Sequence, residues 1–253
     1  MDFTAIIPQE IGTLWVGFNF ALYLCVFGFS LYANLNFNTV VVGLIYLAPL
    51  APVGLDPENL TRVVLVSVQN TVFGVIELVI FVLTVKPSDA TFDREHIQQF
   101  FGHTLPIAAA LIGLSWYARL SPEPVTWVEG LTVLLVFLAG AVFRVLAVYQ
   151  LGTSGFKFDI VFREEQKLMT LKLYSRMRHP SYTGMMVVIA AYALTTGSFY
   201  AAALGLFSAW VGFQYRIHHE ELALEKQFGE AYRQYRSATG MWWPRKQGGD
   251  SAP

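Results

Sequence analysis

Long apolar stretches are the feature of this sequence that most constrains its fold. A helix needs roughly 20 mostly apolar residues to cross the hydrocarbon layer of a bilayer. Seven stretches reach or approach this length, namely residues 11–33, 40–55, 61–85, 104–118, 127–149, 184–196 and 198–217. The sequence therefore predicts an all-α, polytopic integral membrane protein with about seven transmembrane helices.

The composition agrees with lipid as the main solvent of this chain. Of its 253 residues, 55% are hydrophobic and only 14% are charged, whereas about a quarter of the residues in soluble domains are charged. The formal net charge of -1 gives no indication of a nucleic-acid partner. We expect the lipid bilayer to be the first partner of the protein, and the sequence predicts no oligomeric state.

The basic residues predict how the chain is oriented in the membrane. Short cytoplasmic loops carry an excess of Lys and Arg. In the seven-span arrangement, the basic residues after the third stretch and those in residues 157–178 and 216–246 fall on one side, with Arg62 and Arg119 on the other. This predicts an outside N-terminus and a cytoplasmic C-terminus, in a bacterial inner membrane or the endoplasmic reticulum.

Some regions are predicted to depart from straight spans. The second stretch contains Pro49 and Pro52, the fourth contains Pro106, and the sixth is short, so these helices are expected to be broken, tilted or partly covered by neighbours. Between the third and fourth stretches, residues 88–101 combine helix-capping residues with apolar ones and predict a short interfacial helix.

The polar residues are concentrated in two segments, residues 152–182 and 216–244, which flank the last apolar hairpin on the same side. They are therefore expected to fold together. In the first segment, Pro180 disfavours a helical conformation at His179, which places His179 and Tyr182 at the start of a helix. A helix start leaves backbone N–H groups unpaired and is a natural seat for a carboxylate.

The second polar segment begins with carboxylates at the membrane mouth of the last span. Glu220 and Glu221 are placed where they would meet a cationic or hydroxyl-bearing cofactor. The apolar residues that follow, at positions 224, 228, 231 and 235, recur at helical spacing. One helical face is expected to pack on the protein or the membrane surface.

Together, these segments resemble the paired signature of the isoprenylcysteine carboxyl methyltransferases and phospholipid methyltransferases. The resemblance rests on residues 178–184 (Arg-His-Pro-Ser-Tyr-Thr-Gly), 220–224 (Glu-Glu-Leu-Ala-Leu) and 228–232 (Phe-Gly-Glu-Ala-Tyr), and it extends over about residues 140–244. It implies an enzyme that transfers a methyl group from S-adenosylmethionine to a lipophilic acceptor in the membrane. A prenylcysteine-type carboxylate is favoured, and a phospholipid amine or a smaller thiol or isoprenoid-like compound stays open.

The resemblance also implies roles for individual residues. The implied cofactor-binding set is Arg178, His179, Tyr182, Gly184, Glu220 and Glu221. Arg144 and Glu221 are the implied catalytic residues, with Arg144 placed to pair with a substrate carboxylate. We expect no metal site, because the adjacent histidines at positions 218 and 219 point to different helix faces.

These inferences predict a division of the chain into regions. Residues 127–246 would form the methyltransferase-like region with a cytoplasmic cofactor pocket, residues 1–126 would bind substrate or support that region, and residues 247–253 would be a disordered tail. Two intramembrane charges admit more than one interpretation. Arg144 could instead extend to the lipid headgroups, and Glu77 could be functional or a hydrogen-bonded structural carboxyl near Asn70.

Two other function classes stay open on the sequence alone. An NADPH-dependent membrane reductase of sterol-like substrates would share the Arg-His-Pro element but would differ in the acidic pattern after the last span. A non-enzymatic transporter or membrane assembly factor would show charges in several spans and an internal repeat. The sequence shows no repeat.

Overall fold

The computed structural model describes residues 9–33, 40, 43–44, 47–50, 60–84, 94–152 and 167–245, without the side chains of a few of them. Their long elements are all helices, as predicted: α1 (Gln9–Ala33), α3 (Leu60–Thr84), α4 (Arg94–Gln99), α5 (Leu105–Leu120), α6 (Trp127–Leu151), α7 (Pro180–Thr195), α8 (Phe199–Phe228) and α9 (Glu230–Ala238). Short turns are η2 (Ala48–Leu50), the π-helical η4 (Phe100–Thr104) and η5 (Lys172–Ser175). An isolated bridge joins Met177 to Gly240.

Three helical segments of the described residues are long and apolar enough to cross a membrane. They are Leu60–Ile80, Ile97–Leu120 and Trp127–Leu151, and Glu10–Cys25 is a shorter apolar helix. This agrees with an integral membrane protein. Most of the second predicted span lies outside the described residues, and α7 has only 16 residues.

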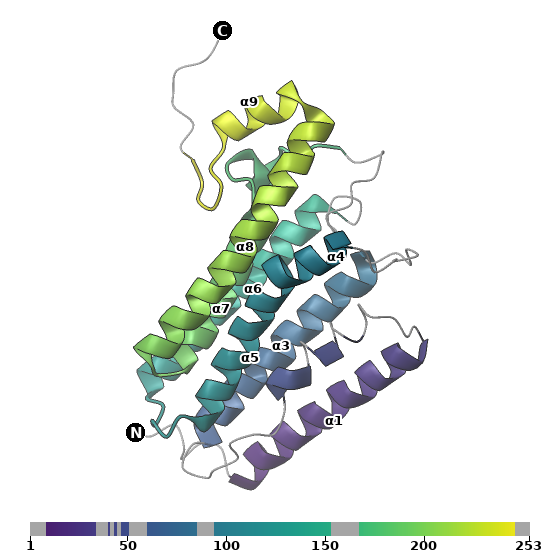
Figure 1. Ribbon diagram of the computed structural model, residues 1–253. Coiled ribbons are helices and arrows are strands. Elements are labelled where there is room, and N and C mark those ends of the chain that lie inside the picture. The colour runs from purple at the N-terminus through teal and green to yellow at the C-terminus, as the bar shows by residue number, and fades with distance from the viewer. Residues whose placement is uncertain are drawn as a thin grey trace.

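The helices α3, α5, α6, α7 and α8 run alongside one another as a bundle (Figure 1). Helix α1 packs on the outer side of α3, and α9 turns across the far end of α8 (Figure 1). Helices α6 and α7 are in close contact, and a Cβ on Gly140 would lie 2.7 Å from the backbone nitrogen of Val188. Small residues at such crossings let transmembrane helices pack backbone to backbone.

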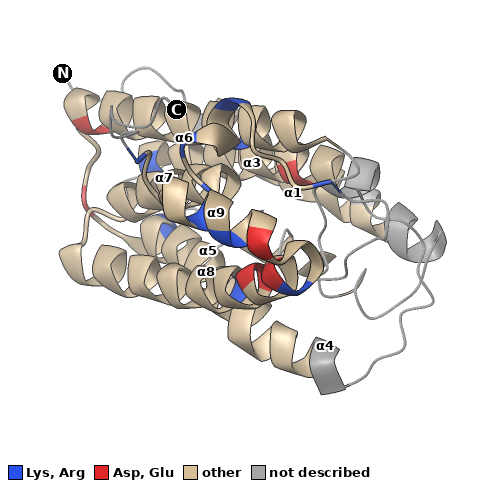
Figure 2. Cartoon of the chain, turned by 90° about the horizontal axis from the view of Figure 1, so that it is seen from above, with Lys and Arg blue, Asp and Glu red and all other residues tan. Residues whose placement is uncertain are grey.

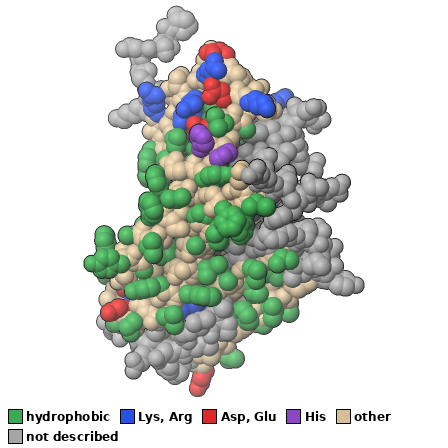
Figure 3. Space-filling view, viewed as in Figure 1, with side chains coloured by type: hydrophobic (Ala, Val, Ile, Leu, Met, Phe, Trp, Pro, Cys, Tyr) green, Lys and Arg blue, Asp and Glu red, His purple; other side chains and the backbone are tan. Residues whose placement is uncertain are grey.

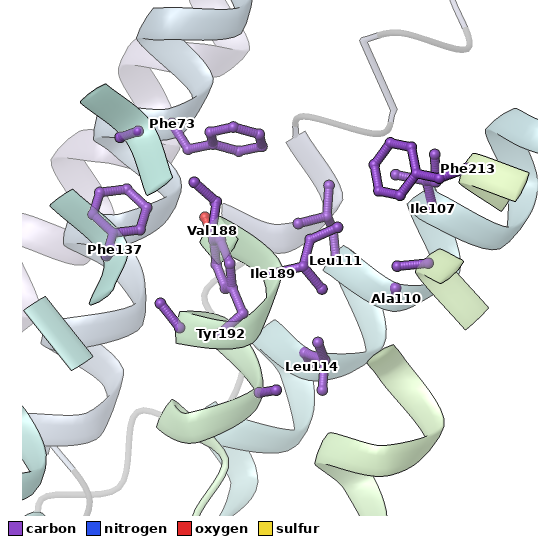
Figure 4. Close-up of a cluster of buried hydrophobic side chains, with 14 of the residues drawn as sticks. Phe73, Ile107, Ala110, Leu111, Leu114, Phe137, Val188, Ile189, Tyr192 and Phe213 are labelled. Carbon is purple, nitrogen blue, oxygen red and sulfur yellow. The ribbon is translucent and has the colours of Figure 1, made fainter. Parts of the chain in front are cut away.

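The buried core lies where α3, α5, α6, α7 and α8 meet (Figure 4). Tyr192 of α7 is at its centre, with edge-on ring contacts to Phe73 of α3 and Phe137 of α6. The outer surface is also rich in apolar side chains, and Phe199 and Tyr200 are at least 80% exposed. Figure 3 shows such residues over the length of the bundle and charged residues gathered at the α8–α9 end. This surface suits contact with lipid.

The predicted interfacial helix before the fourth span is not a separate element. Helix α4 continues through η4 into α5. Pro106, which lacks an N–H, stands at the start of α5, where the backbone N–H of Leu105 bonds to the Phe100 carbonyl. The π-helical turn therefore absorbs the proline without breaking the helix.

One further expectation needs correction. The apolar face predicted across positions 224–235 is interrupted, because α8 ends at Phe228 and Gly229 has a positive φ of 53°. The two basic residues predicted on the opposite side, Arg62 and Arg119, lie within helices α3 and α5 and are only 1% exposed. Arg62 is held by Glu129 at 2.9 Å and by the Thr195 carbonyl.

Candidate active site

The start of α7 adopts the conformation predicted from Pro180. His179 is the residue before the helix, with φ −123° and ψ 53°, and Pro180 occupies the first turn. The segment after α9 fixes this start, because the backbone N–H groups of Arg178 and His179 bond to the carbonyls of Gly240 and Met241 at 2.8 and 3.2 Å. The loop before α7 is therefore held by the C-terminal segment.

The two motifs singled out in the sequence meet at this point. Arg178 Nε donates to Glu221 Oε1 at 2.7 Å, and His179 Nε2 lies 3.1 Å from the same oxygen. The Tyr182 hydroxyl donates to Glu220 Oε2 at 2.7 Å. Figure 2 shows the acidic and basic residues gathered near the α8–α9 junction. The prediction that these polar segments fold together is confirmed.

Glu221 is an ionised carboxylate in a nearly dry site. It is 6% exposed, and His179 is 4% exposed. Burial alone would raise the pKa of Glu221, but the hydrogen bonds from His179 and Arg178 outweigh this effect and lower the pKa to about 2. Glu221 lies inside the continuous helix α8, which also contains the last predicted span.

Of the groups around Glu221, Arg178 makes further hydrogen bonds, whereas the Tyr232 hydroxyl makes none among the described residues. Arg178 Nη1 also donates to the carbonyls of Arg236 and Thr239, at 3.0 and 2.6 Å, and so ties α9 to the loop. The Tyr232 hydroxyl is buried and has no hydrogen-bond partner among the described residues. Burial, followed by the charge of Glu221, raises the pKa of Tyr232. Tyr232 therefore presents a protonated hydroxyl within the field of Glu221.

Arg144 lies on the other side of the start of α7. Its Nε and Nη2 donate to the two carboxylate oxygens of Glu77 at 2.9 and 3.0 Å, and its Nη1 donates to Ser181. Arg144 and Glu77 are each 2% exposed, so the interpretation of Arg144 as a headgroup contact is wrong. Glu77 is paired with Arg144, whereas Asn70 bonds to the Pro49 carbonyl.

Two residues of this site were missed in the sequence. Arg216 Nε donates to the Tyr182 hydroxyl at 2.6 Å, and Arg216 Nη1 lies 3.2 Å from His103 Nε2. Arg216 was used only as a marker of orientation, and His103 lies in a region without a motif. The available signal was the spacing of four residues between Arg216 and Glu220, which places them on one helix face.

Gly184 has a packing role in this arrangement. A Cβ at this position would lie 2.7 Å from the backbone nitrogen of Arg144, so the bare Cα lets α7 approach α6. Its implied contact with a cofactor stays a prediction.

Trp242 packs edge-on against Phe213, and its carbonyl accepts a hydrogen bond from Thr183 at 2.9 Å.

Residues 132–226 match the Isoprenylcysteine carboxyl methyltransferase (ICMT) family. A probable protein-S-isoprenylcysteine O-methyltransferase from Oryza sativa subsp. indica is 29% identical over 136 residues, which are 53% of this chain and 71% of the rice protein. The protein-S-isoprenylcysteine O-methyltransferase of Dictyostelium discoideum is 29% identical over 160 residues, covering 60% of this chain and 64% of its own. The human enzyme of this name is 30% identical over 126 residues, with coverages of 47% and 43%.

The fold is also similar to a solved structure, that of the eukaryotic intramembrane Ras methyltransferase ICMT. The TM-score is 0.54 at 18% sequence identity, over 96% of this chain and 89% of that one. At this identity the likeness concerns the fold. The resemblance inferred from residues 178–184 and 220–224 is confirmed by the family match, which contains both.

Proposed function

We propose that this chain, of which residues 132–226 match the isoprenylcysteine carboxyl methyltransferase family, transfers a methyl group from S-adenosylmethionine to the carboxylate of a prenylcysteine-type acceptor in the membrane. The observation that carries the proposal is the contact of Arg178 and His179 with Glu221 inside the matched region. This contact joins the two halves of the family signature in one buried cluster.

The residues of the cluster suit S-adenosylmethionine. This molecule carries a sulfonium cation, an amino group, hydroxyl groups and an aromatic ring. The cluster offers carboxylates at Glu220 and Glu221, a stacked pair of rings from His179 and Tyr182 with centroids 5.6 Å apart, and the unpartnered hydroxyl of Tyr232. In this proposal, the two carboxylates and the Tyr232 hydroxyl bind the polar groups of the cofactor. The rings of His179 and Tyr182 contact the cofactor beside the start of α7.

Bound S-adenosylmethionine supplies an electrophilic methyl group, and a carboxylate acceptor can attack it without first losing a proton. The protein therefore needs to position the reactants and exclude water rather than supply a base. Glu221, with a pKa of about 2, is not a proton donor at neutral pH. Besides its proposed contact with the cofactor, Glu221 holds Arg178 and His179 against α8.

In this proposal, the acceptor carboxylate is bound by two arginines on the membrane side of this cluster, Arg144 and Arg216. Arg144 is held in a fixed orientation by Glu77 and reaches Ser181 at the start of α7. Arg216 lies one helical turn before Glu220 on α8 and contacts Tyr182. A guanidinium binds a carboxylate through charge-assisted hydrogen bonds, and in a dry site this attraction is strong.

The proposal extends to the topology. We propose seven spans, a cytoplasmic C-terminus and a cofactor pocket on the cytoplasmic side, with residues 127–246 as the catalytic region and residues 1–126 as substrate or support region. The charged residues gathered at the α8–α9 end of the apolar bundle support this arrangement (Figure 3). The predicted tail, residues 247–253, lies outside the described residues.

A radiolabelled methyl-transfer assay tests the acceptor class. The full chain in detergent would be given labelled S-adenosylmethionine with either N-acetyl-S-farnesylcysteine or phosphatidylethanolamine. We expect base-labile methyl ester on the farnesylcysteine and its loss in Arg144→Met. Label on the phospholipid amine instead would reject the carboxylate acceptor. Absence of any transfer, together with NADPH binding, would favour a reductase.

A further inference from the structure

The π-helical turn η4 packs directly on α8, next to the candidate active site. Two glycines allow this approach: a Cβ on Gly102 would lie 2.6 Å from the ring of Tyr215, and a Cβ on Gly212 would lie 2.9 Å from the His103 carbonyl. A π-helical turn within a longer helix is rare and is frequent at functional sites. The close contact brings one side chain of η4, that of His103, against α8.

His103 makes two polar contacts with α8, from its two ring nitrogens. Nδ1 lies 3.3 Å from the Gly212 carbonyl, and Nε2 lies 3.2 Å from Arg216 Nη1. A carbonyl can only accept, so Nδ1 must carry the proton. A guanidinium can only donate, so Nε2 must accept. The two contacts together require the neutral Nδ1–H tautomer, with its lone pair directed at Arg216.

The same guanidinium leads to the cofactor cluster. Arg216 Nε donates to the Tyr182 hydroxyl at 2.6 Å, and that hydroxyl donates to Glu220 at 2.7 Å. A chain of hydrogen bonds thus runs from His103 through Arg216 and Tyr182 to Glu220. Because Tyr182 keeps its own bond to Glu220, loss of His103 would disturb Arg216 more than it disturbs the cofactor residues.

We propose that His103 is a positioning residue, which holds the Arg216 guanidinium in the direction needed to bind the acceptor carboxylate. The proposal rests on the proposed function. It assigns a task in the reaction to the N-terminal half of the chain, since His103 lies outside the matched residues 132–226. Misplacement of a binding group by about 1 Å can cost on the order of 100-fold in rate.

Two substitutions separate this role from simple packing of η4. In His103→Gln the amide oxygen stands near the place of Nε2 and can still accept from Arg216. In His103→Asn the amide stands near the place of Nδ1, so it keeps the Gly212 contact and loses the Arg216 contact. Phe101→Leu is the matched control, because Phe101 is on the same turn and is 62% exposed.

Steady-state methyl transfer to N-acetyl-S-farnesylcysteine, with binding of S-adenosylhomocysteine measured beside it, tests the proposal. We expect His103→Asn to lose roughly tenfold or more in kcat/KM for the acceptor, which corresponds to one weakened charged contact, with little change in S-adenosylhomocysteine affinity. His103→Gln and Phe101→Leu should stay close to the native enzyme.

Three results would overturn the role of His103 while leaving the proposed function intact. They are native-like kinetics in both His103 variants, a loss in His103→Gln alone, or an equal loss in both that is accompanied by weaker S-adenosylhomocysteine binding and lower thermal stability. A native protein that neither binds S-adenosylhomocysteine nor transfers methyl groups would instead reject the proposed function, and the role of His103 with it.

Discussion

At the residue scale, Glu221 organises the candidate site. One of its oxygens accepts from both Arg178 and His179, and Arg236 approaches the other at 3.6 Å. Removing one member of such a buried pair leaves an uncompensated charge, which is costlier than the pair is favourable. Glu221 therefore matters to the fold of this end of the molecule as well as to the proposed cofactor contacts.

The low pKa of Glu221 predicts a defined dependence of stability on pH. Its pKa in the folded protein is about 2, below the ordinary value of 4.5, so ionised Glu221 stabilises the fold above about pH 4.5 and this contribution is lost as the pH falls toward 2. The difference in thermal unfolding temperature between the native protein and Glu221→Gln should be widest at pH 7 and shrink below pH 4.5. Glu230→Gln, with a side chain 69% exposed, is the control, and an unchanged difference down to pH 3 would contradict the account.

Substitutions in the Glu77–Arg144 pair can distinguish an effect on stability from an effect on activity. Both side chains are buried, so Glu77→Met or Arg144→Met alone should lower the free energy of unfolding by about 3–5 kcal/mol, whereas the double substitution should recover much of this loss. Methyl transfer should stay low in the double variant, because no guanidinium is left at this position to bind the acceptor. Recovered stability with recovered transfer would remove Arg144 from the reaction.

At the element scale, the crossing of α6 and α7 sets the position of the site. Gly140 and Gly184 let the two helices approach, and this places Arg144 of α6 beside Ser181 of α7. Arg178 and His179 come before the first turn of α7, so a shift of this helix would move the cofactor residues and Arg144 relative to one another.

Enlarging Gly184 tests this dependence. In Gly184→Ala the new Cβ would meet the Arg144 backbone nitrogen at 2.7 Å, and because backbone cannot move aside cheaply, we expect a loss of about 1–3 kcal/mol and reduced methyl transfer. Gly113→Ala on α5 is the control, since a Cβ there meets nothing within 4 Å. Equal thermal unfolding temperatures for the two variants would show that the crossing tolerates a methyl group.

At the scale of the whole molecule, the sequence predicted the parts that depend on local pattern. Apolar length predicted α1, α3, α6 and α8, and Pro180 predicted the conformation of His179. The contact between the Arg178 and Glu221 segments could be predicted because both flank the same apolar hairpin.

The remaining contacts depend on how distant helices are aligned. Glu77 and Arg144 are 67 residues apart, and no local pattern specifies the register between α3 and α6. The contact of His103 with Arg216 depends on a π-helical turn that has no clear sequence signal. The positive charge of Arg216 was already explained by the predicted membrane orientation. For this reason its place in the site was not predicted from the sequence.

Direct ligand binding is the best test of whether the cluster around Glu221 binds S-adenosylmethionine. S-adenosylhomocysteine and NADPH would be titrated side by side into the full chain in detergent, for the native protein, His179→Ala, Glu221→Gln and the exposed control Glu230→Gln. The account predicts micromolar-range binding of S-adenosylhomocysteine, on the order of −8 kcal/mol, which is retained in Glu230→Gln and lost in the other two variants. Binding of NADPH alone, or binding of S-adenosylhomocysteine that neither substitution weakens, would contradict it.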